Sequence, residues 1–82
     1  MIVYVIHEED LHDGSKGVIG LADSVRMVNT LIDEYYGPHD IVSFNDIRDS
    51  SIEFVKIIQI TLEHAVTYQV KITVQTFELN KV

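Results

Sequence analysis

The stretch IEFVKIIQITLEHAVTYQVKITVQ, residues 52–75, decides the fold of this chain. In its second half, apolar and polar residues alternate with a period of two, and the apolar set is Tyr68, Val70, Ile72 and Val74. In its first half, one face is apolar from Ile52 to Leu62 except at Lys56. Two such runs joined by residues 63–66 predict a long antiparallel hairpin.

Three more apolar runs precede the hairpin and predict further strands. Residues 2–6 are apolar and β-branched, which favours a strand buried on both faces. Residues 17–22 and 41–44 are similar short runs. The polar segments 9–17 and 45–51 contain Asp, Ser, Gly or Asn, residues that form turns, and are predicted to be a loop and a turn.

A helical pattern separates the second predicted strand from the third. Apolar side chains recur at spacings of three and four and form one stripe, made of Val25, Val28, Leu31, Ile32 and Tyr35. Asp23 or Ser24 provides a side-chain oxygen for the helix start, and Gly37 followed by Pro38 ends the helix. The predicted element order is β-β-α-β-β-β, an α+β fold with a single helix on a mainly antiparallel sheet.

Length and composition limit the classes of protein that remain. A chain of 82 residues supports one modest core, so we expect a single domain, residues 1–82. The absence of Cys excludes disulfides, thiolate catalysis and zinc-cysteine sites. No apolar run approaches the roughly 20 residues of a membrane helix, and residues 1–6 lack the basic start of a secretory signal.

The net charge of −7 is unevenly distributed along the chain. Residues 1–53 carry a net charge of −8, and residues 54–82 carry +1. A field of this sign repels nucleic acid and attracts basic proteins, and the six Lys and Arg residues form no basic run. We therefore expect no direct binding of nucleic acid. Solubility alone is the other explanation for the acidity.

The densest group of potential ligands is HEEDLHD, residues 7–13. Its two imidazoles, His7 and His12, could bind a divalent metal together with the neighbouring carboxylates. The spacing matches neither the HExxH motif nor a calcium-binding loop, so the alternative is a solvated acidic loop. No metal or other cofactor is predicted, and His7 and His12 remain the only metal candidates.

No catalytic motif accompanies these residues. The chain has no GxSxG elbow and no phosphate-binding loop, and no sequence pattern places two carboxylates in an apolar pocket. His39 and His64 lie in predicted connections. We therefore expect a protein that is not an enzyme.

Two tyrosines close the predicted helix. Tyr35 belongs to the apolar stripe, whereas Tyr36 stands beside Asp33 and Glu34. Tyr36 either projects outward as a contact for an Arg-rich surface or covers the end of the helix.

Three segments carry a resemblance: IVYVIHEED at residues 2–10, GVIGLADSVRMVNTLID at residues 17–33, and QTFELNKV at residues 75–82. Together they resemble small accessory proteins of phages and prophages of Gram-positive bacteria. In that setting, small acidic proteins resemble anti-restriction or anti-CRISPR inhibitors, which mimic DNA by presenting carboxylates in place of phosphates. The resemblance implies a viral protein that acts in the cytoplasm of the bacterial host.

The leading hypothesis is a non-catalytic inhibitor that blocks a basic nucleic-acid-binding surface of a host defence protein, such as a CRISPR nuclease. The predicted contacts are the exposed acids and one tyrosine: Glu8, Glu9, Asp10, Asp13, Asp33, Glu34, Tyr36, Asp46, Asp49 and Glu53. One alternative is a homodimeric assembly module that pairs through an open sheet edge. The other is a small metal-binding protein centred on the loop of residues 7–13.

Overall fold

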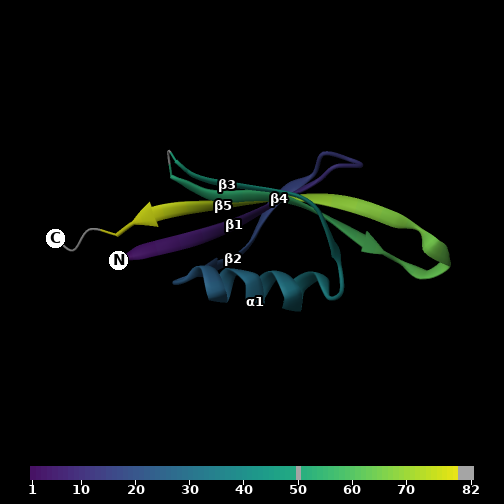
Figure 1. Ribbon diagram of the computed structural model, residues 1–82, viewed down its shortest axis with the longest axis horizontal. Coiled ribbons are helices and arrows are strands. Elements are labelled where there is room, and N and C mark those ends of the chain that lie inside the picture. The colour runs from purple at the N-terminus through teal and green to yellow at the C-terminus, as the bar shows by residue number, and fades with distance from the viewer. Residues whose placement is uncertain (50, 80–82) are drawn as a thin grey trace.

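The computed structural model of the chain describes residues 1–49 and 51–79, and it shows an α+β fold. Its elements are β1 (Ile2–Asp10), β2 (Lys16–Ala22), α1 (Val25–Tyr36), β3 (Asp40–Asp49), β4 (Ile52–Thr61), a 3-10 turn η1 (Glu63–Ala65) and β5 (Thr67–Glu78). The five strands form one sheet in the order β2-β1-β5-β4-β3, and every neighbouring pair is antiparallel (Figure 1). The predicted element order is confirmed.

The hairpin of β4 and β5 forms as predicted. Its register runs from Ile52 opposite Gln75 to Thr61 opposite Thr67. The strand β5 is the centre of the sheet because it also pairs with β1 along nine residue pairs, from Ile2 opposite Glu78 to Asp10 opposite Val70. The first strand of the chain therefore lies beside its last strand. The molecule is elongated, with extents of 53 × 22 × 21 Å along its principal axes.

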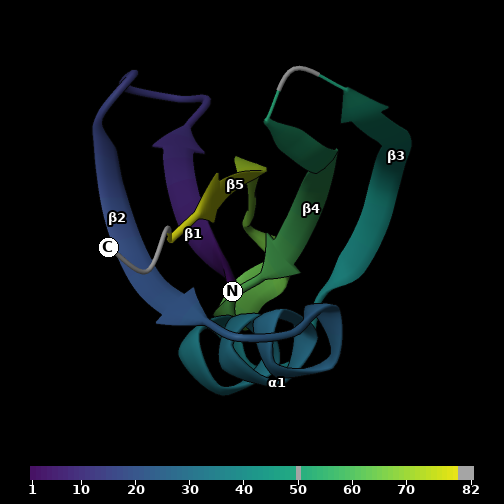
Figure 2. The ribbon, with the colours of Figure 1, turned by 90° about the vertical axis from the view of Figure 1, so that its left-hand side faces the viewer.

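The helix α1 lies against one side of the sheet, with β2 and β3 at the two outer edges (Figure 2). Ser24 is the N-cap, because its Oγ accepts a hydrogen bond from the Met27 backbone N at 3.1 Å. Gly37 ends the helix with φ = 70° and donates its backbone N–H to Asp33. A Cβ added at Gly20 would lie 3.4 Å from the Leu31 side chain, at van der Waals distance, so the helix packs on β2 at this position.

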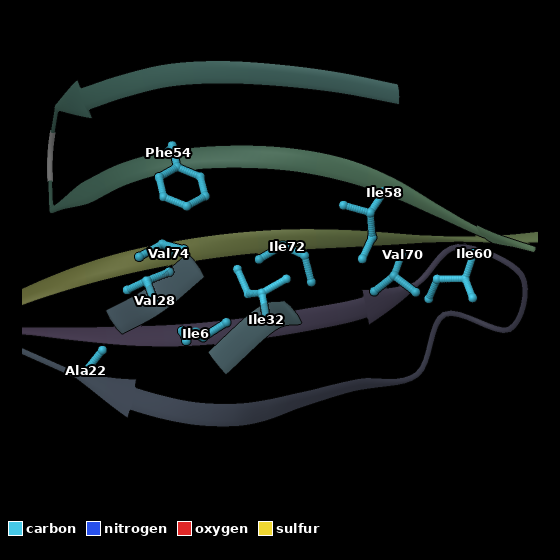
Figure 3. Close-up of a cluster of buried hydrophobic side chains, with 10 residues drawn as sticks. All are labelled: Ile6, Ala22, Val28, Ile32, Phe54, Ile58, Ile60, Val70, Ile72 and Val74. Carbon is cyan, nitrogen blue, oxygen red and sulfur yellow. The ribbon is translucent and has the colours of Figure 1, made fainter. Parts of the chain in front are cut away.

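Ten buried apolar side chains fill the space between helix and sheet (Figure 3). They are Ile6, Ala22, Val28, Ile32, Phe54, Ile58, Ile60, Val70, Ile72 and Val74. Most come from alternate positions of β4 and β5, so the period-two pattern of the sequence is the burial pattern of the fold. Lys56 shares this face and is 6 % exposed, and its Nζ lies 5.8 Å from the centre of the Phe54 ring.

The turn predicted over residues 45–51 is shorter than expected, because β3 continues to Asp49 and β4 begins at Ile52. Asn45 pairs with Val55 and Asp46 pairs with Phe54, so β4 supplies backbone hydrogen bonds that outweigh the local preference for a turn. Irregularities in the register accommodate the turn-forming residues. Arg48 and Ser51 adopt positive φ angles of 46° and 72° near the actual reversal.

The loop predicted at residues 9–17 is also shorter than expected. Glu9 and Asp10 extend β1, and Lys16 and Gly17 begin β2, so the connection is only residues 11–15. The expectation that residues 2–6 are buried on both faces is wrong as well. Ile6 is the only residue of β1 that is buried, because α1 covers one face of the sheet and no described element covers the other.

Candidate partner-binding surface

A groove opens beside the C-terminal end of α1. Its other sides are the end of β1, the beginning of β5 and the turn that follows β1. Its volume is about 370 Å³, and it is lined by Glu8, Asp10, Ser15, Tyr35, Tyr36, Tyr68 and Val70. We call these residues the tyrosine groove. Glu8, Asp10 and Tyr36 were predicted as partner contacts from the sequence, and the fold brings these three together.

Tyr36 is half-buried and connects the helix to β1. Its Oη donates a hydrogen bond to Glu8 Oε2. The phenol is removed from water and lies beside a carboxylate, and both effects raise the pKa of Tyr36 well above its usual value of 10.0. Tyr36 is therefore a neutral hydrogen-bond donor at physiological pH. Of the two placements open from the sequence, the structure shows the one in which Tyr36 covers the helix end.

Tyr35 was predicted to belong to the apolar stripe that faces the core, and this prediction is wrong. It is 58 % exposed, and its ring meets Tyr36 edge-to-face with 4.8 Å between centroids and 78° between planes. Tyr36 follows the buried Ile32 by four residues and so continues the row that faces the sheet. Tyr35 follows the half-buried Leu31 by four and lies at the side of the helix, at the edge of the groove.

Asp10 joins the groove to the turn between β1 and β2. Its Oδ1 accepts the backbone N–H of His12 at 2.7 Å and that of Asp13 at 3.4 Å, and its carbonyl accepts from Gly14 at 2.8 Å. Asp13 accepts in turn from the Ser15 N–H at 2.8 Å, and this bond lowers the pKa of Asp13 below 3.8. Both carboxylates thus organise the turn.

The remaining predicted contacts lie elsewhere. Glu9 faces away from the helix, in register between Lys16 and Lys71. Asp33 Oδ1 lies 3.8 Å from His39 Nε2, and Glu34 is exposed on the helix.

The third predicted group lies around the β3–β4 connection. There Arg48 Nε is 2.9 Å from Asp46 Oδ1 and 3.7 Å from Glu53 Oε1, so one cation partly neutralises two of these carboxylates. Asp49 ends β3. The predicted contact set is therefore divided among several parts of the surface.

The two histidines of the acidic segment lie in different environments. His7 lies on β1, and its Nε2 is 3.0 Å from Gln75 Oε1 across the sheet. His12 lies in the turn after β1. Among residues 1–49 and 51–79, no group of three or more His, Asp or Glu side chains is arranged to hold a metal ion. No described helix has the length and apolarity to cross a membrane.

The sequence analysis missed Tyr35 and Tyr68 as members of the tyrosine groove. Both were assigned to the core by their spacing, whereas Tyr68 is half-buried and Tyr35 exposed. The only signal for them was their place at one end of an apolar run, because Tyr35 is the last residue of the helical stripe and Tyr68 is the first of the run in β5. An aromatic residue with a hydroxyl group at such a position favours an interface between core and solvent. No family model, curated protein or solved structure matches the chain.

Proposed function

We propose that this chain is a non-catalytic binding protein whose acidic surface occupies a basic site on another protein. Its specific form is a phage-encoded inhibitor that blocks the nucleic-acid-binding surface of a host defence protein, such as a CRISPR nuclease. The observation that carries the proposal is the charge of the tyrosine groove and the adjoining turn.

The acids of this surface form no ion pair in the described part of the chain. The ion pairs found there are His39 with Asp33, and Arg48 with Asp46 and with Glu53. Glu8, Asp10 and Asp13 take no part in these ion pairs. The three acids lie within a span of six residues, so their negative charges are concentrated at one place in the sequence. A partner with Arg or Lys at matching positions would neutralise these charges and would be attracted over long range.

A competition assay tests the proposal. The protein is added to a guide-loaded nuclease from a Gram-positive host, and binding of target DNA is followed as the salt concentration rises. We expect DNA binding to fall with added protein at low salt and to recover at high salt, because screening weakens contacts between exposed charges. An absence of competition at every salt concentration contradicts the inhibitor proposal for the nucleases tested.

A matched pair of variants locates the contact. Neutralising Asp10 and Asp13 to Asn removes charges that take part in no ion pair among the described residues. Neutralising Asp46 and Glu53 to Asn and Gln removes an equal formal charge beside Arg48. The first variant should weaken competition more than the second, and equal losses would show that only the total charge matters.

A second candidate function is homodimeric assembly, and the edge strand β3 favours it. This strand carries four exposed apolar side chains, Ile41, Val42, Phe44 and Ile47, with exposed fractions between 41 % and 59 %. An unprotected edge with apolar residues is a template for pairing with another strand. Light scattering separates the two candidates: a dimer that Val42→Lys dissociates supports assembly, and a monomer at high concentration excludes it.

A further inference from the structure

We infer that the tyrosine groove holds the guanidinium group of one arginine side chain from the partner protein. This inference rests on the proposed function and specifies the recognised group. Three aromatic rings and two carboxylates line the same concave surface, and they come from the helix, from β1 and from β5. The groove of about 370 Å³ falls in the lower part of the range of about 300–1,000 Å³ typical of small-ligand sites.

The rings supply surfaces on which a flat cation can stack. Tyr35 is 58 % exposed and is held edge-to-face against Tyr36, so its position is fixed by packing while most of its side chain remains in contact with solvent. Tyr68 lines the groove from β5. Guanidinium groups stack on aromatic faces, and the aromatic quadrupole attracts a cation placed over the ring.

The carboxylates supply acceptors that the fold leaves available. Glu8 Oε2 accepts from Tyr36, and no other hydrogen bond to the Glu8 carboxylate occurs within the described residues. Asp10 Oδ1 accepts hydrogen bonds from the backbone of the turn, and Asp10 Oδ2 has no hydrogen-bond partner among the described residues. Each carboxylate thus has one oxygen held by the protein and a second oxygen available to a ligand.

This combination favours arginine over lysine. Tyr36 stays protonated and donates to Glu8, so the groove keeps two negative charges at neutral pH. A guanidinium offers five donors in a plane, and can contact a carboxylate and stack on a ring at the same time. An ammonium is a compact, strongly hydrated charge without a stacking face, so it should gain less from Tyr35 and Tyr68.

Amide chemical shifts in a nitrogen-15 NMR titration test the inference directly. The probes are Nα-acetyl-arginine amide, its lysine equivalent and its uncharged citrulline equivalent. We expect the arginine probe to shift the amides of Glu8, Asp10, Tyr35, Tyr36 and Tyr68, with a dissociation constant in the millimolar range. The lysine probe should bind about threefold more weakly, because it lacks the stacking contribution, and citrulline should cause no saturable shift.

Variants of the groove are paired with matched controls outside it. Asp10→Asn keeps the Oδ1 acceptor that holds the turn but removes the charge, and its control is Glu34→Gln on the exposed surface of α1. Tyr35→Leu removes an exposed ring, and its control is Phe77→Leu on β5, where the side chain is 47 % exposed. Both groove variants should weaken binding of the arginine probe about threefold or more, while both controls leave it unchanged.

Three results would overturn the arginine site. They are shifts of equal size at Asp46 and Glu34, equal affinity for the lysine and arginine probes, and unchanged binding by the two groove variants. None of these results removes the proposed function, because competition with DNA can persist through the acidic surface as a whole. Conversely, a failed competition assay leaves the NMR titration as an independent measure of the groove.

Discussion

Replacing Ile32 by Ala tests whether the helix is fastened to the sheet as the structure shows. Ile32 is fully buried and is one of two buried helix residues that point into the core, the other being Val28 (Figure 3). Alanine has the higher helix propensity, so any loss of stability must come from packing and not from the helix itself.

The expected loss follows from the size of the deletion. Ile→Ala removes three carbon atoms, worth about 2.4 kcal/mol at about 0.8 kcal/mol each. The cavity left by incomplete relaxation brings the total to about 3–4 kcal/mol. For a domain of this length, each kcal/mol lowers the melting temperature by about 4–8 °C, so a fall of about 12–32 °C is expected.

Urea unfolding followed by circular dichroism measures the free energy, and a thermal scan measures the midpoint. The matched control is Met27→Ala on the same helix, where the side chain is 44 % exposed. The control should change stability by less than about 1 kcal/mol, because little surface is transferred back to water. Equal losses for the two variants would refute the packing of α1 through Ile32.

Three further predictions concern individual side chains. Ser24→Ala removes the cap on the Met27 N–H and should cost about 1 kcal/mol in urea unfolding, with little change if the cap is not formed in solution. Lys56→Met should stabilise the fold by about 0.5–1 kcal/mol at pH 7, because a buried charge is replaced by an apolar chain. Burial lowers the pKa of Lys56 below 10.5, so its charged form costs stability at low pH and the advantage of Met should shrink as pH rises toward 10.5. Because the pKa of Tyr36 is raised above 10.0, the stability from its protonated hydroxyl is complete below pH 10 and lost above it. Tyr36→Phe should therefore flatten the loss of stability above pH 10, and an unchanged pH profile would contradict the contact with Glu8.

The helix end shows how far sequence reasoning reaches toward the candidate site. The spacing of apolar residues identified the helix and its stop at Gly37, but it selected Tyr35 for the core. Both tyrosines fit a stripe three or four residues after Ile32, and only the rotation of α1 on the sheet decides between them. The contact between Tyr36 and Glu8 joins residues 28 positions apart, so no local pattern could indicate it.

The segment 45–51 shows a second limit of prediction from sequence, in which a local preference is overruled by strand pairing. Its Asn, Asp and Ser residues favour a turn locally, yet Asn45, Asp46 and Asp49 all pair with residues of β4. Hydrogen bonds to a neighbouring strand are a tertiary property, and here they outweigh the local preference.

The amino-acid sequence by itself determined the element order, the long hairpin, the core face of β4 and β5, and the acidity of residues 1–53. These features depend on periodicity, on turn and cap residues, and on composition, all of which are local. The tertiary structure alone decided that β1 pairs with β5, and that β2 and β3 are the edges. It also decided that Glu8 and Asp10 meet three tyrosines in one groove. The physical reason is that strand pairing and helix placement bring together residues distant in sequence, and the charge pattern carries no information about which acids become neighbours.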